Sequence, residues 1–467
     1  MIDAQAVVED GLAAAARAGA DGCIVLVDET SHADVRFALN TTTTNGVRRD
    51  RSVTVVVIVN QSAGTARRSG AVDMEEMVNA ALADARSYPP ADDAFTLVDP
   101  STATAIATAA FGKAPALTDV SVLRDVLSGL SGAFDRARRR GAVLAGFAEY
   151  GIATLYMGTS SGLRLSFSQP TGAVNLVGRT ADGTASAWTG APSITPSFGE
   201  MEGEIWRRLD WSGSRIELEA GRYDVILPPS GVSDMMGSLF FYGMGGQDAE
   251  DGRTVFSAAA GTRVGEQLSD VPFTLYSDPL SSGVECMPFV AAGSSSGEVS
   301  VFDNGLPLER TDWIRDGRLA QLRYHRAGAN RSSVRPAPYI DNLILRTGGR
   351  PDRADSENGG SVDEMVARTE RGLLLTCLWY IREVDPATLL MTGLTRDGVY
   401  VIEDGVVIGA ANNFRFNESP VDLLARATEV GTPVRTLGRE LGEYLNRTIM
   451  PPLRIPDFNM SSVSPAS

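Results

Sequence analysis

The sequence has 467 residues, of which 43% are hydrophobic and 21% charged, a balance typical of a globular protein with a buried core. Its length favours about three domains of ordinary size. The formal net charge of −16 argues against a nucleic-acid partner, because binding nucleic acid requires a clustered basic surface.

The N-terminal segment MIDAQAVVED has neither the basic region nor the apolar region of a secretory signal, so no signal peptide is predicted. No apolar run approaches the ~18 residues of a membrane span, so no transmembrane helix is expected. The three cysteines (Cys23, Cys286 and Cys377) form no spaced motif, which suits a reducing compartment. We therefore expect a cytoplasmic protein that does not contact a membrane.

Residues 1–95 carry the pattern of an N-terminal α+β domain. The segment AQAVVEDGLAAAARA (4–18) has apolar side chains at helical spacing. GCIVLVDE, HADVRFALN and SVTVVVIVN are predicted strands, because they alternate or are rich in β-branched residues. The pair Asn45-Gly46 indicates a turn between the last two, and residues 72–85 are predicted to form a second helix.

Residues 96–117 are rich in Ala, Thr, Asp and Pro and are predicted to be a linker. Residues 118–220 form a predicted β-rich central domain that begins with a long helix. Four arginines end this helix before Gly141, and the helix dipole explains them without a phosphate partner. Turn signals at Thr159–Gly162 and Asp182-Gly183 separate the following strands, and TPSFGEMEGEIWRRLDWSGS adds a helix.

Residues 221–467 are predicted to be a C-terminal domain dominated by antiparallel strands and hairpins, so the whole chain is assigned to the α+β class. The segment YDVILPP is a predicted strand, and the helix GVSDMMGSLFFYGMGG follows it. Residues 351–362 are polar and are predicted to be a mobile loop. Helices are predicted at Val362–Gly372 and Pro420–Thr428. Four turn signals favour hairpins: Asp303-Asn304-Gly305, Asp316-Gly317, Asp397-Gly398 and Asp404-Gly405.

Residue types that support hydrolytic chemistry are scarce. His32 and His325 are the only histidines, and neither is expected to bind zinc, because imidazole sites use two or three histidines at defined spacing. The segments GTSSG (158–162) and GSSSG (293–297) match the esterase pattern, but a predicted strand follows each of them where a nucleophile elbow needs a helix. We therefore expect no catalytic residue and no bound metal in this chain.

The helix at residues 231–246 raises a specific question, because it is apolar on most sides. Ser233 or Ser230 is expected to accept backbone N–H groups at its start, and Asp234 suits the positive end of its dipole. A helix that is apolar all round is normally buried in a core or an interface. The residues that we assign to such packing, or to a cleft for a partner or peptide, are Ser233, Met235, Met236, Leu239 and Phe240.

Several stretches together resemble the TldD/PmbA family, also called the TldD/TldE peptidases. The clearest is RGLLLTCLWYIREVDPATLLMTGLTRDGVYVIEDGVVIGAANNFRFNES (371–419), with its TG pair, strand, glycine turn and return strand. VFDNGLPLERTDWIRDGRLAQL (301–322) is similar to a second family segment, although Asn304 replaces an acidic residue common there. The N-terminal helix followed by GAD, and the central TLYMGTSSG, extend the resemblance over nearly the whole chain.

The resemblance implies that this chain is a TldE-type (PmbA-type) subunit. TldD-type subunits carry a zinc-binding HExxxH helix after a strand, and a cysteine near the C-terminus, whereas TldE-type subunits lack the motif and pair with TldD. Here the strand YDVILPP is followed by SDMMGSLFFYG, so the resemblance places zinc in a TldD-type partner of a heterodimer that acts on unfolded or small peptides. A stand-alone or homodimeric binding module for a peptide or carrier protein is the alternative. A self-sufficient hydrolase and a DNA-binding protein are weaker hypotheses.

Overall fold

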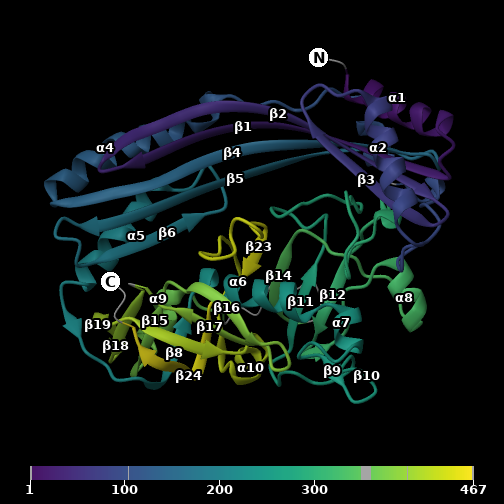
Figure 1. Ribbon diagram of the computed structural model, residues 1–467. Helices are drawn as coiled ribbons and strands as arrows, with labels where there is room; N and C mark the ends of the chain where they lie inside the picture. The colour runs from purple at the N-terminus through teal and green to yellow at the C-terminus, as the bar shows by residue number, and fades with distance from the viewer. Residues whose placement is uncertain (1–2, 104, 349–358, 397, 465–467) are drawn as a thin grey trace.

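A long, curved antiparallel sheet arches over the C-terminal half of the chain (Figure 1). The computed structural model describes residues 3–103, 105–348, 359–396 and 398–464. The sheet has the strand order β3-β2-β1-β4-β5-β6. Its strands are β1 (Gly22–Ala38), β2 (Thr41–Val59), β3 (Ser62–Ser69), β4 (Ala142–Thr159), β5 (Arg164–Thr180) and β6 (Ser186–Ala191).

Helices cover one face of this sheet. The alternation of side chains in β1 shows which face: Val25 and Val27 pack with α1 (Ala4–Arg17) and α2 (Met74–Ser87). Further along the strand, Val35 packs with α4 (Arg124–Arg139) and α5 (Phe198–Trp211). Ile24 and Leu26 point the other way, toward residues of the C-terminal half. The inner face of the sheet is therefore one wall of the interface with the C-terminal half.

The turn between β1 and β2 differs from the predicted one. It lies at Leu39 and Asn40, whose φ angles of 53° and 59° are both left-handed, whereas Asn45 and Gly46 lie within β2. The Asn40 side chain donates to the carbonyl of Ala142 (2.8 Å) and accepts the N–H of Leu144 (2.7 Å). The prediction at Asn45-Gly46 is wrong because these bonds to β4 fix the turn six residues earlier, at Leu39 and Asn40.

The first two predicted domains share this one sheet, because β1 pairs directly with β4 from Ile24 to Phe37. Residues 96–117 connect the two parts and contain the short helices η1 (Pro100–Thr102) and α3 (Ala105–Ala110). The 3₁₀ turn η2 (Val120–Leu123) then leads into α4, and Asp119 accepts the N–H of Ser121 at its start. The connecting segment therefore separates β3 from β4 in the sequence but does not interrupt the sheet, since β1 and β4 are direct neighbours in it.

Two further sheets form the C-terminal half. The six-stranded sheet has the order β13-β12-β11-β14-β23-β22, and the ten-stranded sheet has the order β16-β17-β20-β24-β8-β15-β18-β19-β7, with β21 paired to β24. Strands β9 (Ser257–Ala258) and β10 (Gly261–Thr262) form a separate ribbon. The strands of the six-stranded sheet are β11 (Phe273–Ser277), β12 (Thr311–Arg315), β13 (Arg318–Leu319), β14 (Leu343–Thr347), β22 (Val434–Thr436) and β23 (Thr448–Met450).

Most neighbouring strands of the ten-stranded sheet run antiparallel, and the α+β class is confirmed. Its strands are β7 (Arg215–Ile216), β8 (Gly221–Leu227), β15 (Arg371–Leu375), β16 (Trp379–Asp385), β17 (Leu390–Leu394), β18 (Val399–Glu403), β19 (Val406–Ala411), β20 (Phe414–Glu418), β21 (Glu429–Val430) and β24 (Leu453–Val463). The helical segments of this half are α6 (Pro229–Ser238), the π-helical turn η3 (Leu239–Gly243), α7 (Gly246–Glu250), η4 (Val301–Asp303), α8 (Arg326–Ser332), α9 (Val362–Ala367) and α10 (Pro420–Arg426).

The predicted hairpin turns have mixed outcomes. Asp316-Gly317 joins β12 to β13, and Asp404-Gly405 joins β18 to β19, each with two positive φ angles, as predicted. The segment 303–305 is not a hairpin, because it follows the short helix η4. Asp397 and most of the predicted loop at 351–362 lie outside the described residues.

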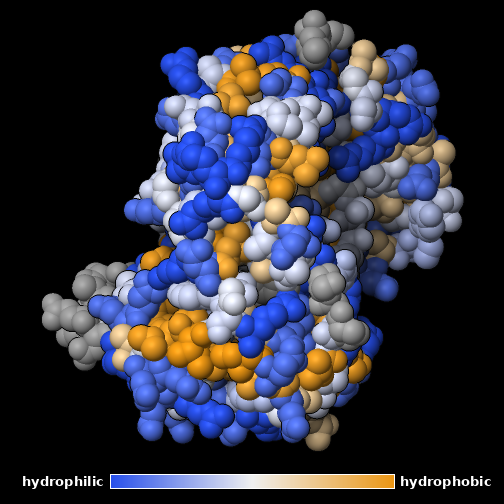
Figure 2. All heavy atoms as spheres, turned by 90° about the vertical axis from the view of Figure 1, so that its left-hand side faces the viewer, coloured by the Kyte–Doolittle hydropathy of each residue, from blue (hydrophilic) through white to orange (hydrophobic). Residues whose placement is uncertain are grey.

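Figure 2 shows the long sheet and its helices as an upper part and the C-terminal half as a lower part. Apolar residues gather in a band across the lower part, over the end of the ten-stranded sheet that contains β18 and β19. Within the described ranges, the helices are too short or too polar to cross a membrane.

Candidate functional site

The strand and helix that the family resemblance singles out are β8 and α6, and α6 continues into η3. The five residues that sequence analysis assigned to this position are all at most 2% exposed: Ser233, Met235, Met236, Leu239 and Phe240. The four apolar ones belong to a core with residues from both C-terminal sheets. Ser233 forms a hydrogen bond of 3.0 Å with Thr448 on β23. None of the five lines any of the cavities described below.

The start of this helix is different from the prediction. Helix α6 begins at Pro229, with Pro228 before it and no side-chain cap, so Ser233 lies in the second turn. The capping prediction for Ser230 or Ser233 is wrong because Pro228 occupies the N-cap position and the fixed φ of Pro229 starts the helix before either serine.

Asp234 is the residue whose role on this helix the sequence did not reveal. Its carboxylate is fully buried and accepts the backbone N–H groups of Arg439 (2.9 Å), Glu440 (3.1 Å) and Leu441 (2.9 Å). Burial raises the pKa of Asp234 to about 7, against the opposite effect of the three hydrogen bonds. Asp234 therefore fastens the segment before β23 onto α6.

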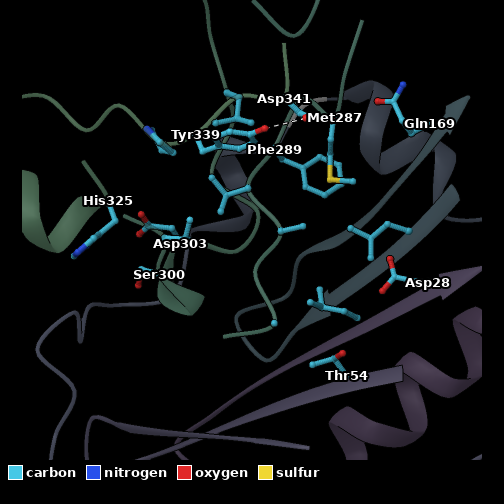
Figure 3. Close-up of a pocket in the computed structure, with 18 of the residues that line it drawn as sticks. Asp28, Thr54, Gln169, Met287, Phe289, Ser300, Asp303, His325, Tyr339 and Asp341 are labelled. Carbon is cyan, nitrogen blue, oxygen red and sulfur yellow. Dashed lines mark hydrogen bonds between the residues drawn. The ribbon is translucent and has the colours of Figure 1, made fainter. Parts of the chain in front are cut away.

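A separate cavity lies between the inner face of the long sheet and the C-terminal half, and we call it the central cavity. Its volume is about 420 Å³, within the usual range for a small-molecule or peptide site. Strands β1, β2, β4 and β5 form one wall, and residues 287–308 and 338–341 form the other. In Figure 3, Asp28 and Thr54 come from the sheet, opposite Phe289 and Tyr339. Most of the lining surface is apolar.

Arginine pairs hold three carboxylates of the central cavity. Glu298 contacts Arg323 (2.7 Å), Asp303 contacts Arg326 (2.7 Å), and Asp341 contacts Arg447 (2.6 Å). Burial raises the pKa of Glu298 and of Asp341 even though the arginines oppose this shift. All three pairs join residues of the C-terminal half, so these carboxylates are already paired with arginine.

Two further side chains place polar groups at the central cavity. The hydroxyl of Tyr339 donates to Asp341 (3.0 Å), as the dashed line in Figure 3 shows. Asp28, on the opposite wall, has its pKa raised by burial, and the charge of Arg67 counteracts that effect. The arrangement offers apolar contacts and a few hydrogen-bonding groups, which suits an extended peptide. Sequence analysis did not find it because its residues are separated by hundreds of positions.

The serine segments are not nucleophile elbows. GTSSG forms the turn between β4 and β5, and the hydroxyl of Ser161 donates to the carbonyl of Val98 (2.8 Å). GSSSG lies in an irregular segment, and the short helix η4 follows it where we had predicted a strand. The strand predicted after the first segment is β5, and the strand predicted after the second segment is wrong.

Comparisons with known proteins show to which family the chain belongs. Residues 220–462 match the model of the PmbA/TldA metallopeptidase C-terminal domain, which is more than half of the sequence. The chain belongs to the PmbA/TldD family. The family resemblance inferred from the sequence is thereby confirmed. No curated protein matches significantly.

Three solved structures share the fold of this PmbA/TldD family member. TldE from Thermococcus kodakarensis has a TM-score of 0.74 at 16% identity, with 97% of this chain and 99% of that chain covered. A candidate modulator of a DNA gyrase from Thermotoga maritima has a TM-score of 0.74 at 14% identity and the same coverage. A candidate modulator of DNA gyrase from Bacteroides thetaiotaomicron has a TM-score of 0.75 at 14% identity, covering 99% and 100%.

The residues at the position where the sequence resemblance expects a zinc helix do not fit that metal in this chain. Zinc sites use imidazole, thiolate and carboxylate ligands, whereas α6 supplies methionines and small residues, and its carboxylate Asp234 is occupied by three N–H donors. His32 lies on β1 and His325 precedes α8. In the part of the chain that the structure describes, no three His, Cys, Asp or Glu side chains are placed to hold a metal ion.

Proposed function

We propose that this chain is the non-metal, TldE-type subunit of a heterodimeric TldD/TldE zinc metallopeptidase in the cytoplasm that degrades or processes unfolded or small peptides. The observations that carry the proposal are the family membership and the composition of α6, whose one carboxylate, Asp234, already accepts three backbone N–H groups. Such a chain has the peptidase fold but offers no metal ligands on this helix to activate water. Zinc and the catalytic step belong to a TldD-type partner in this proposal. The central cavity of this chain supports a role in holding peptide.

Co-expression with a TldD-type chain that carries HExxxH tests this proposal. We expect one complex on size exclusion, with zinc bound to the partner, and peptide cleavage that a chelator stops. A partner whose HExxxH glutamate is replaced by glutamine is the matched control, since the complex should form and not cleave. Separate elution of the two chains at micromolar concentration contradicts the proposal, as does stoichiometric zinc in this chain alone.

A stand-alone peptide-binding module is the second candidate. It is supported by the central cavity, whose volume of about 420 Å³ and mostly apolar lining suit a small peptide. Peptide binding by the purified chain, together with no association with any TldD-type chain, would establish this alternative.

A further inference from the structure

Two more cavities adjoin the central cavity, one on each side. The first, about 630 Å³, shares His325 with it and contains Asp92 and Asp93, so we call it the acidic cavity. The second, about 450 Å³, shares Gln169 with it and contains Arg435, so we call it the arginine cavity. Figure 3 shows His325 and Gln169 on opposite sides of the central cavity. The three cavities thus form a row with opposite charges at its ends.

The acidic cavity contains a buried carboxylate that lacks a donor. Asp93 is 9% exposed, and its Oδ2 atom is buried without a hydrogen-bond partner in the described chain. Arg331, the cation of this cavity, donates to the carbonyl of Asp92 (2.8 Å) and to Oε1 of Gln247 (3.3 Å), and not to a carboxylate. A buried acceptor left unpaired is costly, so this position favours a ligand that brings N–H donors and positive charge.

His325 does not oppose such a ligand. Its Nδ1 atom accepts the N–H of Gly328 (3.2 Å), so the neutral ring carries its proton on Nε2. Burial lowers the pKa of His325, which keeps the ring neutral at pH 7. The remaining carboxylate of the cavity, Asp251, already has a cation, because Arg253 lies 3.0 Å from it. Asp92 and Asp93 are therefore carboxylates of this cavity that form no ion pair with the described residues, and Arg331 lies in the cavity with them.

The arginine cavity contains Arg435, an exposed cation on β22. Arg435 lies opposite Ile449 in the pairing of β22 with β23, and Arg447 is two residues before Ile449, so both side chains project from the same face. Arg447 is bound to Asp341 and to Thr171. Arg435 forms neither an ion pair nor a hydrogen bond with the residues that the structure describes.

The surroundings of Arg435 suit a carboxylate on an apolar chain. Partial burial and the charge of Arg447 lower the pKa of Arg435, the charge of Glu285 opposes this shift, and the residue as a whole is exposed. Glu285 lies in the same cavity but not within ion-pair distance of either arginine. Phe167 and Ile194 provide apolar walls. A carboxylate could accept two N–H groups from one guanidinium at this position.

We infer that the row of cavities binds a short peptide with free ends, its terminal ammonium at Asp93, its apolar side chains in the central cavity and its terminal carboxylate at Arg435. The inference rests on the peptide binding proposed above and adds its direction and the chemistry of its ends. Two opposite charges separated by an apolar cavity match the two ends of one peptide better than they match a single charged group. The ligand class is therefore a small, apolar, unblocked peptide, in contrast to an internal stretch of a long chain.

Calorimetry with the purified full-length chain tests this inference. The probe is Ala-Leu-Phe-Leu-Ala in three forms: with both ends free, N-acetylated, and C-amidated. We expect each blocked form to bind the wild-type chain at least about tenfold more weakly, the effect of losing one charge-assisted hydrogen bond. Arg435→Gln should weaken the free and acetylated forms but not the amidated one. Asp93→Asn should weaken the free and amidated forms but not the acetylated one.

The controls separate this inference from the proposed function. Arg17→Gln removes an exposed arginine on α1 and should leave every affinity unchanged. Arg435→Lys should keep most of the preference for a free carboxylate, which guards against a folding defect in Arg435→Gln. Equal binding of free and blocked peptides overturns the inference but leaves peptide binding in place. Failure of every form to bind, alone or in complex with the TldD-type partner, contradicts the peptide-holding role itself.

Two further outcomes also overturn the inference. If Arg435→Gln affects only peptides with a free N-terminus, the assigned direction is wrong. If a lysine side chain inside an acetylated peptide restores full affinity, the acidic cavity recognises side-chain ammonium groups and not the peptide end.

Discussion

Replacing Asp234 by asparagine removes the only ionisable side chain of α6 and should change how stability depends on pH. Its folded pKa of about 7 is above the unfolded value of about 3.9, so the protonated form is favoured by folding. The corresponding stability is fully present below the unfolded pKa and is lost as pH rises through the folded pKa. From these two pKa values, the loss between pH 5 and pH 8 is about 3 kcal/mol.

The asparagine variant should not show this loss. It should instead have a constant cost of about 1–3 kcal/mol, because its amide N–H₂ would face an N–H donor such as that of Arg439. Urea denaturation of both proteins across this pH range measures the difference between their free energies of unfolding. That difference should shrink as pH rises. The exposed Asp135→Asn on α4 controls for the loss of one acidic group.

Hydrogen exchange gives a second measurement of the same interaction. Amide protons at 439–441 should exchange faster in Asp234→Asn, because their acceptor is altered. A difference in unfolding free energy that stays constant from pH 5 to pH 8 would refute the reasoning, since the burial of the carboxylate would then have no energetic consequence.

Three other changes have predicted outcomes. Asn40→Ala should cost about 3 kcal/mol of unfolding free energy, from two lost hydrogen bonds and a left-handed backbone, as urea denaturation can measure. Gly64→Ala should cost a similar amount, about 3 kcal/mol, because its Cβ would lie 2.1 Å from a backbone nitrogen of α2, and thermal unfolding checks this. Burial raises the pKa of Cys23 and Cys286 to about 12, so both thiols should resist a thiol reagent at pH 8 in the native protein and react after denaturation; fast native reaction would contradict this.

Local turn chemistry could be predicted from the sequence where it depended on neighbouring residues alone. Asp316-Gly317 and Asp404-Gly405 are turns because their backbone needs two positive φ angles, which these residue types tolerate. Asn45-Gly46 carries the same signal and yet continues a strand. The hydrogen bonds of Asn40 to β4 place the turn at Leu39 and Asn40 instead. Because these bonds join residues that are distant in the sequence, the residues around the turn do not indicate them.

Some features of the larger fold could be predicted from the sequence, and others could not. Residues 22–38 were predicted as two strands, because polar residues such as Thr30 and Ser31 interrupt the apolar pattern, whereas β1 is continuous. The buried state of α6 could be anticipated, because a helix that is apolar all round has no polar face to expose. The central cavity could not, since Asp28 and Tyr339 meet only through the pairing of whole sheets.

The pairing of β1 with β4 has a consequence for the integrity of the chain. Lys113 is the sole lysine of the sequence and lies at an exposed position in the segment that joins the two parts of the long sheet. A lysine-specific protease can therefore cut the polypeptide at one bond only. The fragments on either side would remain interlocked by the backbone ladder from Ile24 to Phe37, so the nicked molecule should migrate as an intact protein until a denaturant separates its halves.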